Sequence, residues 1–297
     1  MQSYKSVSPV VVVIILVFAV CIKSETTVFK PHLFGQHRTL TKRTLRDQNA
    51  TNEERVIGDL STLRTWLHDQ KFVDDVLDTL LLNGRVEEVV QNPNFKLLDN
   101  YVDMFNSKYP KQKMSLIEIL TARHSEFDLA QALMRAKQSE NTRNIATKLQ
   151  NQQLKGWLNS QKTIDDAYSL LKIKEDGIIS VISPKQETMH KYIQLFNAKY
   201  PQQKTDLYRV LCDGFGGEDK FAILISHAME HPATAGGASK YRCIMFRQWL
   251  EKDYDPMSVL INVIKYTENN VATTSSREKS IVAVYKPIYY REMGLDM

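Results

Sequence analysis

The sequence predicts an all-α protein built from tandem helical repeats of about 91 residues. Apolar residues recur at helical spacing, and the period-two alternation that is typical of strands is not evident. In addition, one ten-residue motif occurs twice: "YVDMFNSKYP" (101–110) and "YIQLFNAKYP" (192–201) share six of ten residues, at an offset of 192 − 101 = 91. A period of this length indicates repeat units larger than those of most solenoids.

Three tryptophans keep the same period. Trp66, Trp157 and Trp249 are separated by 157 − 66 = 91 and 249 − 157 = 92 residues, and leucine follows each of them. A large aromatic residue at one repeated helical position is typical of a core, where truncation to alanine costs about 3–5 kcal/mol. We interpret these positions as structural anchors rather than a ligand site. The predicted anchors are Leu63, Trp66, Leu154, Trp157, Phe246 and Trp249.

Capping signals predict where several helices begin and end. Ser115 with Glu118 has the pattern of a capping box, and Asn92 and Ser183, each followed by proline, are predicted N-caps. The helix after each of these prolines should end at the Tyr-Pro pair that closes the ten-residue motif, because proline disfavours the α conformation of the residue before it. Each unit then has four or five short helices.

The repeat also predicts how the chain is divided. The helix that carries a tryptophan should end one unit and start the next, so that it joins them rigidly. The third copy is truncated and is predicted to cap the second, with a polar loop at 267–280. The predicted divisions are a signal peptide at 1–24, a disordered leader at 25–57, a first module at 58–150, a second at 151–242 and a truncated third at 243–297.

The N-terminus has the features of a secretory signal peptide. Lys5 precedes an apolar run at residues 10–22, and small or polar residues follow, with cleavage after Cys21 or Ser24. A transmembrane helix needs roughly 20 apolar residues, and this run is shorter. We therefore expect secretion, with no membrane attachment after cleavage.

Cysteine content and charge narrow the class of protein further. Only Cys212 and Cys243 are certain to follow the signal peptide. One bridge between them is an option, but two free thiols in a reducing compartment are favoured, because secreted proteins that rely on disulfides carry more cysteines. The net charge of +5 is modest, and the basic residues are interspersed with acidic ones. No nucleic-acid surface is therefore expected.

Catalytic and metal-binding motifs are scarce. His227, Glu230 and His231 resemble a zincin helix only loosely, because the acid is not beside the first histidine. The acid pairs Asp74-Asp75 and Asp165-Asp166 suit helix starts better than acid–base catalysis. We expect no catalytic residues, metal or cofactor, although an uncharacterised all-helical enzyme using the two histidines remains the alternative.

The polar leader carries two short motifs in a fixed order. "RTLR" occupies 43–46 and "NEER" occupies 52–55, behind the signal peptide and before the helical units. This arrangement resembles the secreted RxLR effectors of oomycete plant pathogens. The residues that fill the RxLR and EER patterns are Arg43, Leu45, Arg46, Glu53, Glu54 and Arg55. Asn49, between them, matches a glycosylation sequon.

The helical part is similar to the WY and LWY modules of that family. "IATKLQNQQLKGWL" (145–158) resembles the family's L motif. The family's signature tryptophan falls here at Leu98 and Met189, and its tyrosine at His124 and Phe215. The resemblance therefore implies a fold of tandem WY/LWY modules, with different residues at these core positions.

The resemblance also implies a function. The leader would direct secretion and delivery into plant cells, where the modules act in the cytoplasm or nucleus as a non-enzymatic adaptor that binds a host protein and suppresses immunity. Some tandem members recruit host protein phosphatase 2A, so its scaffold subunit is one candidate partner. We expect a monomer. A secreted structural or adhesive protein is a third hypothesis, which the small number of cysteines disfavours.

Overall fold

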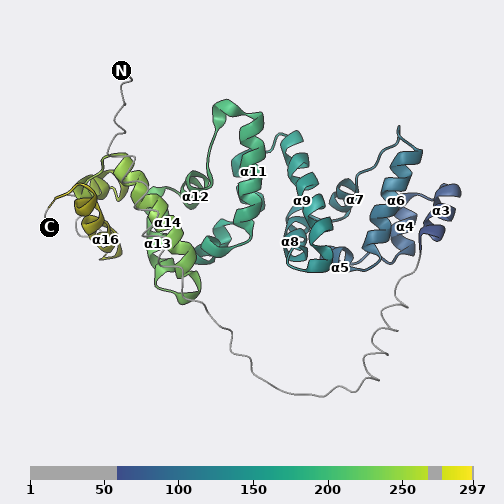
Figure 1. The fold of residues 1–297 in the computed structure, drawn as a ribbon, viewed down its shortest axis with the longest axis horizontal. Coiled ribbons are helices and arrows are strands. Elements are labelled where there is room, and N and C mark those ends of the chain that lie inside the picture. Colours follow the sequence, from purple (N-terminus) through teal and green to yellow (C-terminus); the bar gives the residue numbers. More distant parts are fainter. Residues whose placement is uncertain (1–58, 267–275, 296–297) are drawn as a thin grey trace, which may run out of the picture. The chain divides into compact units, whose positions relative to one another are not determined.

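A computed structural model describes residues 59–266 and 276–295 (Figure 1). Within these ranges the secondary structure is helical and contains no strand, which confirms the all-α prediction. Contacts divide the described chain into two compact units, one ending at Thr163 and the other beginning at Ile164. The signal peptide, the leader with its motifs, and most of the predicted polar loop lie outside the described residues.

The first unit contains seven helices in its described part. They are α3 (Leu60–His68), α4 (Val73–Thr79), α5 (Val86–Gln91), α6 (Phe95–Lys108), α7 (Leu116–Arg123), α8 (Glu126–Ala136) and α9 (Glu140–Asn159). Helix α6 packs on α3 and α4, and α8 packs on α5 and α9. The apolar faces of these helices enclose one core, in which Leu98, Tyr101 and Leu129 are fully buried.

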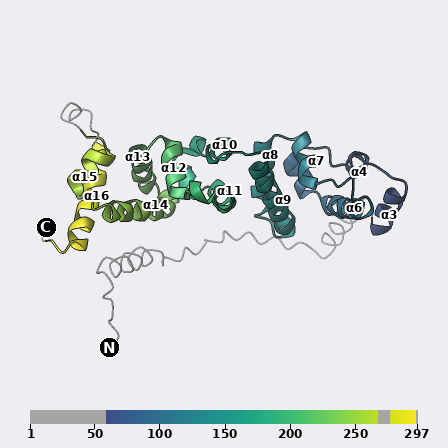
Figure 2. The same cartoon turned by 90° about the horizontal axis from the view of Figure 1, so that it is seen from above.

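The second unit repeats this order of helices. Its elements are α10 (Ile164–Leu170), η1 (Lys174–Ile182), α11 (Lys185–Lys199), η2 (Pro201–Gln203), α12 (Leu207–Phe215), α13 (Glu218–Met229), α14 (Pro232–Glu251), α15 (Pro256–Ser258), η3 (Val259–Val263) and α16 (Ser276–Glu292). Helices α13 and α14 lie side by side in both views (Figure 2), and α13 also contacts η1, α12 and α16.

The helix bounds keep the period of the sequence motif. Helix α10 starts 164 − 73 = 91 residues after α4, and α14 starts 232 − 140 = 92 residues after α9. The extra residue falls at the end of α12, where Gly216 is the C-cap with φ 99° and Gly217 follows with φ 126°. Positive φ angles of this kind favour glycine, because the backbone of other residues would be strained there. The two glycines therefore accommodate the inserted residue.

Each tryptophan helix ends in the same turn. Its first residue beyond the C-cap is left-handed although it is not glycine: Gln70, Gln161 and Asp253 have φ of 57°, 59° and 53°. The next backbone N–H donates to the carbonyl of the tryptophan, as in a Schellman motif. These hydrogen bonds are Lys71 to Trp66 (2.9 Å), Lys162 to Trp157 (3.0 Å) and Tyr254 to Trp249 (2.9 Å).

A buried tyrosine holds this turn from a neighbouring helix. The Tyr101 hydroxyl donates to the carbonyl of Lys71 at 2.5 Å, and the Tyr285 hydroxyl donates to that of Tyr254 at 2.7 Å. Both tyrosines are fully buried, and their rings meet the tryptophan rings edge-on, at 6.4 Å for Trp66 and 5.2 Å for Trp249. The tyrosine therefore connects the core to the backbone of the turn.

The asparagine of the ten-residue motif holds a second loop. The Asn106 amide donates to the carbonyl of Met114 at 2.8 Å and accepts from its N–H at 2.7 Å. Asn197 makes the same pair of bonds with Thr205, at 2.7 and 3.0 Å. One side-chain amide thus satisfies both backbone groups of a loop residue, which gives a physical reason for asparagine in both copies.

The predicted anchors differ in burial. Leu63, Leu154, Trp157, Phe246 and Trp249 are buried, whereas Trp66 is partly exposed, with the Lys71 ammonium 4.9 Å from its ring centre. Leu98 and Met189, at the family's tryptophan position, are fully buried. The smaller side chains therefore still fill core positions.

Two of the predicted helix starts are wrong. Helix α6 begins after Asn94 and α11 after Pro184, so Asn92 and Ser183 each lie before the N-cap. Asn92 instead accepts from the backbone N–H of Asn94 at 2.9 Å, inside a turn. Pro93 belongs to this preceding turn, whereas Pro184 is the N-cap of α11.

Other end signals are confirmed. Ser115 and Glu118 form the predicted capping box of α7, and α6 and α11 have Tyr109 and Tyr200 as their C-caps. Residues 276–280, predicted as the end of a polar loop, instead form the first turn of α16. The apolar residue Ile281 is buried directly after them and binds this turn to the core.

We predict that Trp249→Ala destabilises the protein far more than Trp66→Ala. Trp249 is fully buried, and its indole N–H donates to Glu218 at 2.7 Å, so its truncation should lower the free energy of unfolding by about 3–5 kcal/mol. The partly exposed Trp66 should cost less. Chemical denaturation of both variants measures the difference, and equal losses would contradict this account of the anchors.

We also predict that Asn106→Ala destabilises the first unit. The change removes both hydrogen bonds to Met114 and leaves two partly buried backbone groups unpaired, which should cost about 1–3 kcal/mol. Asn100→Ala, on the same helix, is the control, since its side chain makes no such bond. Denaturant unfolding compares the two, and similar stability would rule out the clamp.

Candidate partner-binding surface

The motif residues of the leader lie outside the described residues. This holds for the six residues of the RxLR and EER patterns and for the sequon. They are Arg43, Leu45, Arg46, Glu53, Glu54, Arg55 and Asn49. Their roles in delivery and glycosylation stay predictions.

The two histidines near the end of α13 do lie close together, but the acid between them is engaged elsewhere. The His227 and His231 rings are 5.2 Å apart. Glu230 receives a bidentate pair from Arg277, at 2.6 and 3.0 Å, and this bond holds the pKa of Glu230 below its usual range. In residues 59–266 and 276–295, no group of three or more His, Cys, Asp or Glu side chains has the geometry of a metal site.

The structure bears on one of the two thiols that were expected to be free. Cys212 is free and buried. Burial raises the pKa of the Cys212 thiol to about 12. Since the thiolate is the nucleophile, Cys212 is a core residue rather than a reactive one.

The acid pairs lie where helix-dipole arguments place them. Asp74 and Asp75 are in the first turn of α4, and Asp165 and Asp166 are in the first turn of α10. In the first unit Asp74 also accepts from Arg123 at 2.7 Å. These acids therefore stabilise helix ends.

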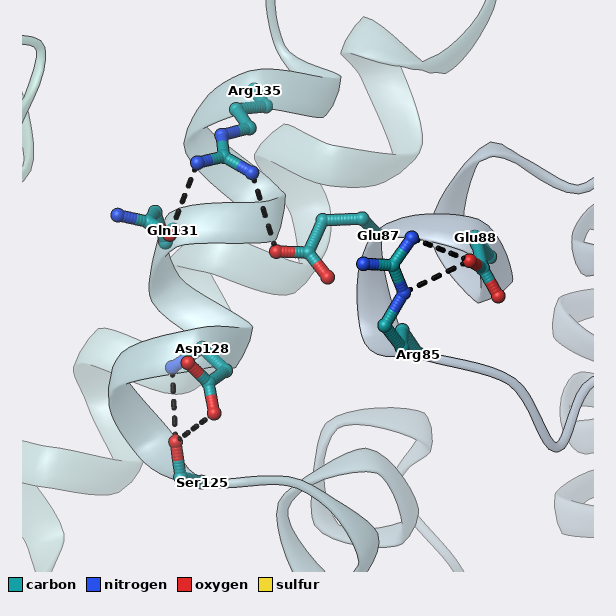
Figure 3. A network of polar contacts seen from close by, with 7 residues as sticks. All are labelled: Arg85, Glu87, Glu88, Ser125, Asp128, Gln131 and Arg135. Atoms are coloured by element: carbon teal, nitrogen blue, oxygen red, sulfur yellow. Dashed lines mark hydrogen bonds and ion pairs between the residues drawn. The ribbon is translucent and has the colours of Figure 1, made fainter.

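Helices α5 and α8 together present a charged surface, which we call the α5–α8 face (Figure 3). Their valine, leucine and alanine residues are buried between them, so the polar positions of both helices point outward. This separation follows from the helical period, with apolar residues on one side only. The residues of the face are Arg85, Glu87, Glu88, Ser125, Asp128, Gln131 and Arg135.

Hydrogen bonds link these side chains in three groups. Arg85 donates twice to Glu88, at 2.9 and 2.7 Å. Arg135 reaches from α8 to Glu87 on α5, at 3.4 Å, and also donates to Gln131 at 3.2 Å. Ser125 caps α8 by accepting from the N–H of Asp128 at 3.1 Å. The face is thus held on rigid helices rather than on loops.

The ion pairs of the face are open to exchange with a partner. The Arg85 and Glu88 side chains are 81% and 56% exposed, and their mutual hydrogen bonds raise the pKa of Arg85 and lower that of Glu88. Exposed pairs contribute little net stability, since water competes for both charges. A partner can therefore replace these contacts at small cost.

Sequence reasoning missed this face. The signal was present in the charged residues that interrupt the apolar positions of 85–91 and 125–136. However, the Glu87 to Arg135 pair joins residues 48 positions apart, so only the packing of α5 on α8 brings them together. The fold and this face define a helical-repeat protein whose exposed charged surface suits protein recognition.

Known proteins identify the family. The chain is 32% identical over 238 residues to an RxLR effector protein of Phytophthora infestans, across 78% of this chain and 33% of the relative. It is 28% identical over 246 residues to the RxLR effector protein PSR2 of Phytophthora sojae, across 76% of this chain and 37% of the relative. No protein-family model matches.

A solved structure shows the same fold. The crystal structure of PcRxLR12 superposes with a TM-score of 0.72 at 23% identity, over 85% of this chain and 59% of that chain. The family recognised from the sequence is thereby confirmed: the chain is an RxLR effector of the oomycete kind with a WY-type helical fold. It spans about a third of the length of the curated relatives it matches.

The helices of the described residues can be compared with the requirements for crossing a membrane. Between residues 59 and 266 and between 276 and 295, none of them combines the length and the apolar character that a bilayer crossing requires.

We predict that removing the charges of the α5–α8 face leaves the fold intact. Arg85→Ala with Arg135→Ala should unfold at nearly the same temperature as the unchanged protein, because one of the ion pairs lost is exposed and the other is partly exposed. Thermal unfolding followed by circular dichroism measures this. A clear drop in the midpoint would show that the face is structural instead.

Proposed function

We propose that the chain is a secreted virulence effector that enters plant host cells and suppresses immunity by binding a host protein, without catalysis of its own. The relatives named RxLR effector proteins support the effector class and secretion. The observation that carries the adaptor role is the α5–α8 face, an exposed charged surface on rigid helices. The leader would direct export and delivery, to the cytoplasm or nucleus, and the protein would act as a monomer.

Burial separates the residues that we propose hold the fold from those that we propose bind the partner. The repeated residues, such as Trp249 and Tyr285, are in the core and hold the fold. The exposed residues of α5 and α8 do not follow the repeat and are free to match one partner. Recognition would therefore depend on surface residues that differ between the modules.

One specific partner is the core enzyme of host protein phosphatase 2A, captured through its scaffold subunit by the LWY-type modules. The support is the tandem layout of helical units, because the family resemblance implies this partner for some tandem members. Pulldown of the scaffold subunit by the mature protein favours this version of the function, and its absence under matched expression rejects it.

An all-helical enzyme is the second candidate, and His227 with His231 is the observation that favours it. In that case the two imidazoles would bind zinc. Metal analysis of the purified protein decides the matter, since less than one zinc per chain removes the support for this candidate.

We predict that tagged residues 57–297, expressed in plant cells, capture one dominant host protein that mass spectrometry identifies. A variant with Arg85→Glu and Arg135→Glu should lose this partner if the α5–α8 face makes the contact, because the reversed charges would repel any acidic group that the two arginines bind. Capture of no host protein by the folded, unchanged chain would contradict the adaptor function.

Two controls separate loss of contact from loss of fold. Trp157→Ala replaces a buried anchor and should abolish capture by unfolding the protein. The charge-reversed variant should instead retain the thermal midpoint of the unchanged protein. Capture that persists with the charges reversed would move the contact away from this face.

A further inference from the structure

A hollow of about 550 Å³ opens in the second unit between α10, the start of η1 and the end of α12. Three acids line it, Asp165, Glu175 and Asp213, together with two lysines, Lys172 and Lys174. The formal charge of these groups is 2 − 3 = −1. Both lysines are exposed.

A buried polar atom lies beside this hollow without a partner. Tyr168, one of the lining residues, is 6% exposed, and its hydroxyl forms no hydrogen bond within the described part of the chain. Burial raises the pKa of Tyr168 to about 12, so the hydroxyl remains neutral. A buried hydroxyl normally has a hydrogen-bond partner, and this one lacks it at the wall of a hollow.

The equivalent place in the first unit is filled by an arginine. Arg123, at the end of α7, donates to Asp74 at 2.7 Å and to Asn83 at 3.0 Å. At the repeat offset these three residues correspond to Gly214, Asp165 and Lys174, because 214 − 123, 165 − 74 and 174 − 83 all equal 91. All three of the corresponding residues line the hollow.

The second unit therefore has glycine in place of Arg123, but it has an aspartate, Asp165, at the position of Asp74. Gly214 leaves the hollow open, and a side chain there would collide with the ring of Tyr168, which lies against it. Tyr168 itself replaces Leu77, again at 168 − 77 = 91. Asp165 has no ion-pair partner within residues 59–266 and 276–295, whereas Asp74 is held by Arg123.

We propose that this hollow receives an arginine side chain from a partner protein, in the place that Arg123 fills in the first unit. The guanidinium donates to the Asp165 carboxylate and to the Tyr168 hydroxyl oxygen. Glu175 and Asp213 add negative charge at the rim. The inference deepens the proposed adaptor function, on which it rests, by naming the chemistry of one partner contact.

Direct binding of a small probe tests the hollow without any host protein. The 15N-labelled full chain is titrated with acetyl-Gly-Arg-Gly-amide, and the amide signals of Gly214 and Ser169 are followed by NMR. Saturable shifts are expected, with binding at least about tenfold weaker when citrulline replaces arginine, since the charge is then lost. Equal binding of the citrulline peptide would overturn the proposal.

Matched variants locate the site. Asp165→Asn should weaken binding about tenfold, whereas Asp74→Asn, the same change in the first unit, should leave it unchanged. The double variant Tyr168→Leu with Gly214→Arg places in the second unit the residues that the first unit has at these positions. It should abolish binding, because the chain's own arginine then fills the hollow. Retained binding in this double variant, or in Asp165→Asn, would refute the site.

The same variants separate this inference from the proposed function. A host protein whose capture survives both Asp165→Asn and the double variant would overturn the hollow as a contact and leave the adaptor function standing. Capture that is lost in both variants, while their thermal unfolding is unchanged, supports the hollow as the place where the partner's arginine binds.

Discussion

The hydrogen bond from a core tyrosine to the turn after a tryptophan helix, present after α3 and after α14, is the contact that fixes how the chain leaves these helices. The turn contains a left-handed residue that is not glycine, such as Gln70 or Asp253, and this conformation costs roughly 1–2 kcal/mol. Tyr101 and Tyr285 offset that cost, since each donates to the carbonyl that follows the strained residue. The direction in which the chain leaves the helix is thereby set by the core.

The helices could be predicted well from the sequence because their signals come from residues that are close together in the chain. The tryptophan period, the Ser115–Glu118 box and the helix ends at Tyr109 and Tyr200 depend on local chemistry or on core positions that recur. The starts of α6 and α11 were misplaced because Asn92 and Pro93 belong to a turn before α6, and because Pro184 rather than Ser183 is the N-cap of α11.

The surface was harder to predict, because its contacts join distant segments. Arg123 meets Asp74 across 49 positions, and Arg135 meets Glu87 across 48. Neither pair follows from the repeat, which reports only what the core requires. Trp66 shows the same limit within the repeat itself: it occupies an anchor position, yet its partial exposure depends on which helices happen to cover it.

The hollow of the second unit shows how such a repeat acquires different surfaces at little cost to its core. Exchange of Arg123 for Gly214 removes a long side chain, and exchange of Leu77 for Tyr168 returns much of the lost volume from the neighbouring helix. Neither exchange is favourable alone, since a side chain at 214 collides with the tyrosine ring. The pair keeps the packing but leaves the buried Tyr168 hydroxyl without a hydrogen bond beside the exposed Asp165 carboxylate, and a specific partner can satisfy such a buried polar group.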